Sequence, residues 1–182
     1  MKVIGVVGLP ASGKGEFAKI LAAEGVPIVI MGDMIRRAVA EAGLPPTDAS
    51  MGSVANRLRA EGGMDAIAKL CVPVIQEQNA PLVLVDGIRG DSEVRLFQQQ
   101  FPGFKVIAID TAFEKRLERL KGRGRSDDTT TAETLVARDE RELGWGLGAA
   151  LALADHRVNN DADLATFTAT VKALLRTLEA DP

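Results

Sequence analysis

Residues 8–15 read Gly-Leu-Pro-Ala-Ser-Gly-Lys-Gly, and this motif is the strongest indication of the fold in the sequence. It follows a short apolar run at 3–7 and precedes an amphipathic segment at 16–23, which is the strand–loop–helix setting that a phosphate-binding loop requires. Glycines let successive amides point at one anion, and the start of the next helix adds partial positive charge. The alternative is an ordinary turn with a solvated lysine, but the motif matches in both spacing and context. We expect the phosphates of a nucleotide to be bound by Gly8, Pro10, Ala11, Ser12, Gly13, Lys14, Gly15 and Glu16.

Short apolar runs alternate with amphipathic segments along the chain, which is the pattern of strand–helix units around a parallel sheet. Strands are expected at 3–7, 27–31, 82–85, 106–109 and, more weakly, 156–159, where Asn159 and Asn160 are expected to form a turn. Helices are expected at 16–23, 34–42, 53–60, 65–77, 92–101, 114–121, 132–143 and 164–178. We interpret residues 1–182 as a single domain with a small helical insertion at about 32–79 and a short lid at about 122–131.

Composition limits the classes of function. A chain of 182 residues with 46% apolar residues is large enough to form a hydrophobic core without disulfides or a structural metal. Its one cysteine, Cys71, excludes an intrachain disulfide or a multi-cysteine zinc site. With 25 acidic and 22 basic residues the net charge is -3, which gives no support to general nucleic-acid binding. No apolar run approaches the roughly 18 residues that span a bilayer. We expect a cytoplasmic protein without a nucleic-acid or membrane partner, and a protein partner stays open.

The loop sequence Gly-x-Pro-x-x-Gly-Lys-Gly resembles that of adenylate kinases and other nucleoside monophosphate kinases. In that family glycine also follows the lysine, and Mg²⁺ is held mainly through water. The resemblance implies ATP as the phosphoryl donor and Mg²⁺ as the cofactor. Those kinases place threonine where this chain has Glu16, whose carboxylate phosphate would repel. Either Glu16 turns away from the phosphates or the donor site differs in detail.

A second resemblance concerns the acceptor. Residues 32–36, Gly-Asp-Met-Ile-Arg, resemble the Gly-Asp-Met-Leu-Arg segment that opens the acceptor-binding insertion of adenylate kinases. There the arginine grips the acceptor phosphate and the aspartate orders Mg²⁺-bound water, which implies these roles for Arg36 and Asp33. By itself the pattern also suits a helix-capping Asp33 and a surface Arg36.

The third strand ends in Asp-Gly-Ile-Arg at 86–89. A carboxylate at the end of a buried strand beside the phosphate loop is where Mg²⁺ coordination through Asp86 is expected, with capping of the next turn as the alternative. The segment resembles the Asp-Gly-Phe-Pro-Arg of adenylate kinases without the proline, which implies acceptor binding by Arg89. The adenine-recognising glutamine of that family is absent, because Asp-Ser-Glu follows at 91–93. AMP is therefore not implied as the acceptor.

Arginines gather around the expected lid. Arg116, Arg119, Arg123 and Arg125 lead into Ser-Asp-Asp at 126–128, and Glu133, Arg138 and Arg141 follow. Planar guanidinium groups suit phosphate oxygens. The order resembles the lid of short-lid nucleoside monophosphate kinases, which implies Arg119, Arg123 and Arg125 at the donor phosphates and Arg138 and Arg141 between donor and acceptor. The alternative is a salt-bridged helical surface.

Residues 86–90 and 138–146 most resemble an archaeal adenylate-kinase-related family that is defined by its fold. The resemblance implies an α/β P-loop NTPase with a five-stranded parallel sheet, order 2-3-1-4-5, and helices on both faces. It implies phosphoryl transfer from ATP to a small phosphate-bearing acceptor, such as a nucleoside monophosphate. Two alternatives stay open. One is transfer to the hydroxyl of a dephospho-coenzyme-A-like molecule, with Asp33 or Asp86 as base, and the other is a nucleotide-dependent switch or slow ATPase with a protein partner.

Overall fold

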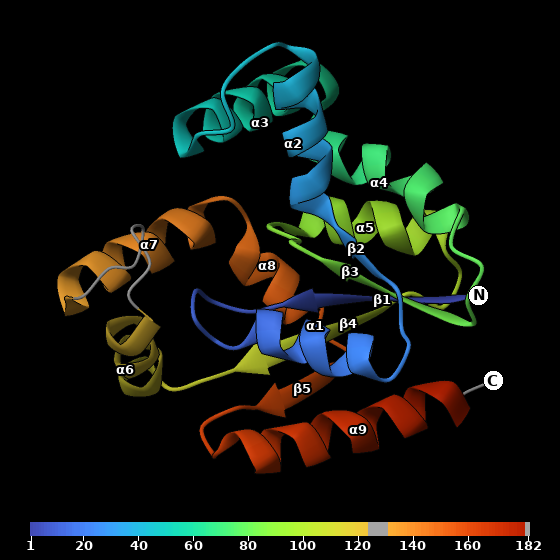
Figure 1. The fold of residues 1–182 in the computed structure, drawn as a ribbon, viewed down its shortest axis with the longest axis vertical. Coiled ribbons are helices and arrows are strands. Elements are labelled where there is room, and N and C mark those ends of the chain that lie inside the picture. The colour runs from blue at the N-terminus through green and yellow to red at the C-terminus, as the bar shows by residue number, and fades with distance from the viewer. Residues whose placement is uncertain (124–130, 181–182) are drawn as a thin grey trace.

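A parallel five-stranded sheet forms the centre of the protein, with the strand order β2-β3-β1-β4-β5 (Figure 1). The computed structural model describes residues 1–123 and 131–180. The strands are β1 (Lys2–Val7), β2 (Ile28–Ile30), β3 (Leu82–Asp86), β4 (Lys105–Asp110) and β5 (His156–Asn159). β1 lies between β3 and β4, with Val6 opposite Asp86 on one side and Ile107 on the other. The predicted fold class and strand order are confirmed.

Helices cover both faces of the sheet because the central strands carry apolar residues on both sides. Ile4 and Val6 of β1 pack with α1 (Lys14–Ala23) and α9 (Leu164–Ala180). Val3 and Val7 face the opposite layer, formed by α4 (Ala66–Gln76), α5 (Asp91–Gln100) and α8 (Leu147–Ala152). No helix within the described ranges is long and apolar enough to cross a membrane.

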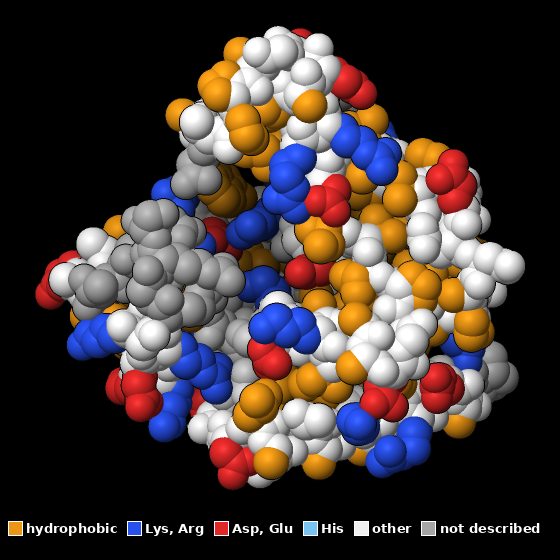
Figure 2. Space-filling view, viewed as in Figure 1, with side chains coloured by type: hydrophobic (Ala, Val, Ile, Leu, Met, Phe, Trp, Pro, Cys, Tyr) orange, Lys and Arg blue, Asp and Glu red, His pale blue; other side chains and the backbone are white. Residues whose placement is uncertain are grey.

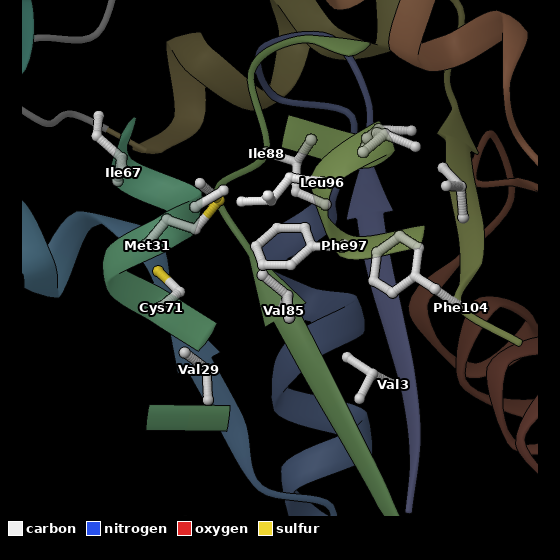
Figure 3. Close-up of a cluster of buried hydrophobic side chains, with 14 of the residues drawn as sticks. Val3, Val29, Met31, Ile67, Cys71, Val85, Ile88, Leu96, Phe97 and Phe104 are labelled. Atoms are coloured by element: carbon white, nitrogen blue, oxygen red, sulfur yellow. The ribbon is translucent and has the colours of Figure 1, made fainter. Parts of the chain in front are cut away.

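The larger core cluster brings β1 close to an aromatic pair. Figure 3 shows Phe97 of α5 beside Phe104, and the two rings stack with their centroids 5.4 Å apart. Gly5 of β1 faces this cluster, where a β-carbon would lie 2.5 Å from the Ile88 side chain and 2.7 Å from Phe104. A larger residue at Gly5 would therefore displace the segment that leads from β3 into the candidate site.

Two helical groups stand away from the sheet (Figure 1). In the expected insertion, α2 (Met31–Glu41), which begins directly after β2, and α3 (Asp48–Gly62) stand away from the sheet, whereas α4 packs on it. The second group consists of α6 (Phe113–Arg123) and α7 (Ala132–Gly144). The short α8 was not predicted as a helix. It follows Gly146, whose φ of 99° suits glycine, and its six residues are too few to show a helical period.

Candidate active site

A cleft of about 920 Å³ opens at the carboxyl ends of the strands, which is where open α/β sheets bind ligands. Figure 2 shows lysine and arginine side chains gathered in the hollow between the α2–α3 insertion and the α6–α7 arm. The phosphate loop and the end of β3 contribute to the lining, as do side chains from α2, α3, α6, α7 and the segment after β5. The cleft therefore joins the segments that sequence analysis singled out.

The phosphate loop is shaped by its backbone and held from outside. Gly13, at the start of α1, adopts a left-handed conformation with φ 108°, and Ala11 has φ 61°. The Ser12 carbonyl accepts hydrogen bonds from Thr111 Oγ1 (2.8 Å), Asn160 Nδ2 (2.9 Å) and Arg119 Nη1 (3.3 Å). These three donors fix the direction of the carbonyl, while the first amides of α1 lack intrahelical partners. The loop is thus arranged to receive an anion.

Asn160 is a residue whose role sequence reasoning missed. A β-carbon on Gly13 would overlap Asn160 Nδ2, so the loop and this side chain are in close contact. The expectation that both asparagines form a turn is wrong for Asn160, which is 5% exposed and supports the phosphate loop. Asn159 does form the turn, because its Oδ1 accepts from the Asp161 amide at 3.0 Å.

The side chain of Lys14 folds back onto the start of the phosphate loop. Its Nζ donates to the carbonyl oxygens of Gly8 (2.5 Å) and Leu9 (3.1 Å). Burial, together with the charge of Arg89, lowers the pKa of Lys14 to about 8, whereas Glu142 and Asp86 oppose the shift. A polyanion beside Nζ would stabilise the ammonium, so this lysine is suited to bind phosphate.

The remaining loop positions differ in how they meet the cleft. All eight expected phosphate-binding residues except Gly8 line it. Gly8 lies beneath the loop, where a β-carbon would approach Ser12 Oγ to 2.5 Å. The carboxylate of Glu16 pairs with Lys19 Nζ at 3.2 Å, which partly neutralises the charge that phosphate would meet. A β-carbon added to Gly15 would have no described atom within 4 Å, so this position borders open space.

Arg116 and Arg119 of α6 both contact the phosphate loop, but in different ways. Arg119 lines the cleft and donates to the Ser12 carbonyl at 3.3 Å and the Asn160 carbonyl at 2.5 Å. Arg116 is 3% exposed and forms a two-pronged pair with Asp139 of α7 (2.8 and 2.7 Å). It also donates to a phosphate-loop carbonyl at 3.2 Å. Arg116 therefore ties α6 and α7 to the loop, while Arg119 is exposed to a ligand.

The two expected metal-binding carboxylates are in different situations. Asp86 lines the cleft, and burial raises its pKa, against the effects of Lys14, Arg89 and a hydrogen bond from the Gly87 amide. Asp33 accepts from Arg36 Nε at 2.9 Å and is not among the described residues that line the cleft. Within the described ranges no three His, Cys, Asp or Glu residues are grouped to hold a metal. Mg²⁺ usually takes one or two carboxylates together with substrate phosphates, so Asp86 suits a phosphate-bound ion.

The acceptor side contains ion pairs both between distant elements and within one helix. Arg36 and Arg89, the expected acceptor-binding arginines, both line the cleft. Arg89 Nη1 donates to Glu142 Oε2 of α7 at 3.0 Å. The other Glu142 oxygen lies 3.6 Å from Nε of Arg138, which also lines the cleft. Glu142 thus pairs with Arg89 from the end of β3 and with Arg138 from the preceding turn of its own helix.

A further ion pair, between Glu93 of α5 and Arg59 of α3, links the Arg89 segment to the insertion. Glu93 is 2% exposed, and its Oε2 accepts from the Arg89 amide at 2.6 Å. Its Oε1 lies 3.7 Å from Nη2 of Arg59 in α3. Burial raises the pKa of Glu93, while the Arg89 amide and Arg59 lower it. Both Arg59 and Glu93 line the cleft.

Sequence reasoning assigned no role to Arg59, Glu93 or Glu142. Glu93 carried a local signal, because acidic residues are common in the first turn of a helix. Arg141, expected between donor and acceptor, lies outside the cleft lining and stacks on Trp145, with its guanidinium carbon 5.6 Å from the ring centroid. Of the other predicted lid residues, Arg125 and the Arg123 side chain lie outside the described part of the structure.

The two stretches that carry the archaeal-family resemblance meet in space. A β-carbon on Gly90 would lie 2.8 Å from the Trp145 carbonyl oxygen, and one on Gly146 would lie 3.2 Å from the Asp91 carboxylate. This close backbone approach places residues 90–91 directly against 145–146. The contact between Arg89 and Glu142 follows from it.

A phosphate loop between β1 and α1, on a sheet of this order, defines a P-loop protein with a kinase-like fold. A family described as an AAA domain matches residues 4–143. A UPF0200 protein from Methanoregula boonei is 65% identical over the full length of both chains, and one from Methanoculleus marisnigri is 60% identical over 96% of each. The chain therefore belongs to the UPF0200 family of AAA-domain P-loop proteins.

Solved structures show the same fold at low identity. TT1252 from Thermus thermophilus has a TM-score of 0.70 at 18% identity, with 97% of each chain covered. Shikimate kinase from Bacteroides thetaiotaomicron has a TM-score of 0.64 at 15% identity, covering 97% of this chain and 98% of that one. The fold is thus shared with a known kinase.

Proposed function

We propose that this protein is an ATP- and Mg²⁺-dependent phosphotransferase that moves the γ-phosphoryl group to a small phosphate-bearing acceptor, namely a nucleoside monophosphate. One observation carries the proposal: a single cleft is lined both by the phosphate loop with Lys14 and by the two arginines Arg36 and Arg89. Two cationic regions in one cleft suit two phosphate-bearing ligands held in line. The volume of about 920 Å³ is near the upper end of ligand pockets.

The donor would lie along the phosphate loop. The loop amides and Lys14 would bind the β- and γ-phosphates, and Arg119 would reach the same region from α6. Ala162 and Leu164, in the segment after β5, line the cleft and offer apolar surface to the nucleotide base. Arg123 and Arg125 belong to the proposed donor set as well.

The acceptor phosphate would lie between Arg36 and Arg89, with the insertion around the rest of the acceptor. An acceptor phosphate oxygen would bond to the γ-phosphorus as the bridging bond to the β-phosphate breaks, and the electron pair leaves with ADP. No general base is needed, because the attacking oxygen is already ionised. Arg138, which lines the cleft, would neutralise charge during the transfer.

Mg²⁺ would be held by the ATP phosphates and, through water, by Asp86, with Asp33 as a further proposed contributor. When bound, it neutralises charge on the β- and γ-phosphates. Asp86 is well placed for this because it ends β3 beside Lys14. We place the activity in the cytoplasm, since a reducing compartment suits a chain whose one cysteine is a buried free thiol.

A hydroxyl acceptor is the second candidate, and one observation favours it. Asp86 has a raised pKa and lines the cleft, which are the properties of a general base for an alcohol. Shikimate kinase, which shares the fold, is named for a substrate that is not a nucleotide. A dephospho-coenzyme-A-like alcohol would then replace the nucleoside monophosphate.

An acceptor panel tests the proposal. ADP formation from Mg²⁺-ATP is measured with each nucleoside monophosphate, with dephospho-coenzyme A, with shikimate and without acceptor. We expect one nucleoside monophosphate to raise the rate at least about tenfold, a gain well within what transition-state stabilisation by arginine supplies. The Lys14→Ala variant, purified in parallel, controls for contaminating kinases. Hydrolysis that every acceptor leaves unchanged contradicts the proposal and favours a nucleotide switch or slow ATPase, while a response only to an alcohol selects the second candidate.

A further inference from the structure

Glu142 is a buried carboxylate in a cleft where basic side chains outnumber acidic ones. The residue is 3% exposed, and burying an ionised carboxylate is strongly unfavourable in free energy unless the carboxylate is paired. Its two oxygens are divided between two partners. Oε2 accepts from Arg89 Nη1 at 3.0 Å, and Oε1 lies 3.6 Å from Arg138 Nε. Arg138 Nε has no hydrogen-bond partner among the described residues, and within that part of the chain it forms an ion pair with Glu142.

The carboxylate offsets repulsion between converging cations. Arg89 and Arg138 both act electrostatically on Lys14, and Glu142 acts on it with the opposite sign. These four groups are therefore close enough to interact in one region of the cleft. Without Glu142, two guanidinium groups and an ammonium would repel one another and move apart toward solvent.

Glu142 is also held firmly in place. It lies near the end of α7, just before Trp145 and Gly146, whose backbones pack against Gly90 and Asp91. The same contact fixes the segment that carries Arg89. Both ends of the Arg89–Glu142 pair are thus set by backbone packing rather than by flexible side chains alone.

The pairing leaves donors available for a ligand. A guanidinium has five N–H donors, and Arg89 uses only its Nη1 toward Glu142. The Arg89 side chain is 42% exposed while that of Glu142 is 4% exposed, so the arginine and not the carboxylate is presented to the cleft. A phosphate can therefore bind Arg89 while Glu142 still holds it.

We propose that Glu142 is a positioning residue that holds Arg89 and Arg138 at the point of phosphoryl transfer. It acts through the two arginines and does not itself contact the reacting atoms. This inference rests on the function proposed above. It assigns a role to a residue that lies outside the phosphate loop, the acceptor arginines and the metal-binding carboxylates.

The kinetic test uses Glu142→Gln, which keeps the shape and removes the charge. With the acceptor found in the panel, we expect kcat/KM to fall about 10- to 100-fold, the scale expected when catalytic groups are misplaced. ATP affinity should stay within about twofold, and Glu142→Asp should recover part of the loss. Glu140→Gln, an exposed change of the same kind on the same helix, should match the wild type.

A double-mutant cycle separates positioning from general stability. In an Arg89→Met background, Glu142→Gln should cost less than about threefold, because its main partner is already gone. The inference is overturned if Glu142→Gln leaves kcat/KM within twofold of the wild type. It is also overturned if the full loss persists in the Arg89→Met and Arg138→Met backgrounds, or if ATP affinity falls in parallel.

A second measurement needs no turnover. Phenylglyoxal modifies accessible arginines, and peptide mass spectrometry gives the rate at each site relative to exposed Arg176. Glu142→Gln should speed modification of Arg89 and Arg138 several-fold. Unchanged rates at both overturn the inference, whatever the acceptor panel shows. If the wild type lacks acceptor-dependent turnover but these rates rise, the proposed function fails and the hold of Glu142 on the two arginines stands.

Discussion

The two sides of the cleft are built differently. The donor side is a short continuous loop whose shape depends on backbone conformation at Gly13 and on three donors to one carbonyl. The acceptor side consists of side chains from α2, α3, α5, α7 and the end of β3, held in ion pairs within and between these elements. A main-chain anion site needs few partners, whereas a side-chain site needs charges that balance. Substitutions on the donor side should therefore lower ATP affinity, whereas substitutions on the acceptor side should lower kcat/KM for the acceptor.

The largest effect is expected for Lys14→Ala on the donor side. Removing its charge should weaken Mg²⁺-ATP binding and reduce turnover about 10³-fold or more, as with other charges that stabilise phosphoryl transfer. The measurements are calorimetric titration with Mg²⁺-ATP and steady-state ADP formation. Lys172→Ala, which removes a lysine paired with Glu24 on the surface, is the control and should leave both unchanged. Wild-type turnover in Lys14→Ala would refute the phosphate-loop assignment.

Gly13→Ala should damage the same side through the backbone. A left-handed conformation costs a non-glycine residue about 1–2 kcal/mol, and the new β-carbon would press on Asn160. ATP affinity should fall at least about tenfold, since that corresponds to about 1.4 kcal/mol. Thermal unfolding of Gly15→Ala serves as the folding control, because open space surrounds that position. Unchanged ATP affinity in Gly13→Ala would show that loop shape does not set binding.

Gly90→Ala should affect the acceptor side selectively. Its β-carbon would lie 2.8 Å from the Trp145 carbonyl, so the two backbones must separate and draw Glu142 away from Arg89. We expect acceptor kcat/KM to fall about tenfold by misplacement of Arg89, with ATP affinity within twofold. Gly144→Ala, with open space around it, should behave as the wild type. If Gly90→Ala lowered ATP affinity as much as acceptor kcat/KM, the two sides of the cleft would not act separately, which would contradict the prediction.

The smallest expected effect is a pH dependence of the donor side. Because Lys14 has a pKa of about 8 in the folded chain and an ordinary lysine value near 10.5 when unfolded, the unfolded state binds more protons between these values. The cost of its buried charge is present in full below pH 8 and is relieved as pH rises toward 10.5. ATP binding restores the ammonium, so titration near pH 9 in buffers of different ionisation enthalpy should reveal proton uptake. Lys14→Met should lack this uptake, and a wild type without it would contradict the assigned cause.

The same contrast explains what could be predicted from the sequence. The sheet order, most elements and residues 10–16 of the loop were predicted because each depends on a local pattern or on a motif of fixed spacing. The pairs Arg59–Glu93 and Arg89–Glu142 were missed because their members lie 34 and 53 positions apart in the chain, and no local pattern marks such a pair. The side chain of Asn160 was expected in a turn for the same reason, since its partner Ser12 lies 148 positions away in the chain.

The most direct test of the central claim is the structure of the protein with a non-hydrolysable ATP analogue and Mg²⁺. We expect the β- and γ-phosphates to accept hydrogen bonds from the loop amides at Gly13 to Gly15. Lys14 Nζ should have left the Gly8 and Leu9 carbonyls to contact the phosphates. At saturating analogue, a loop without phosphate, or Lys14 still bound to those two carbonyls while the triphosphate lies elsewhere, would contradict the account.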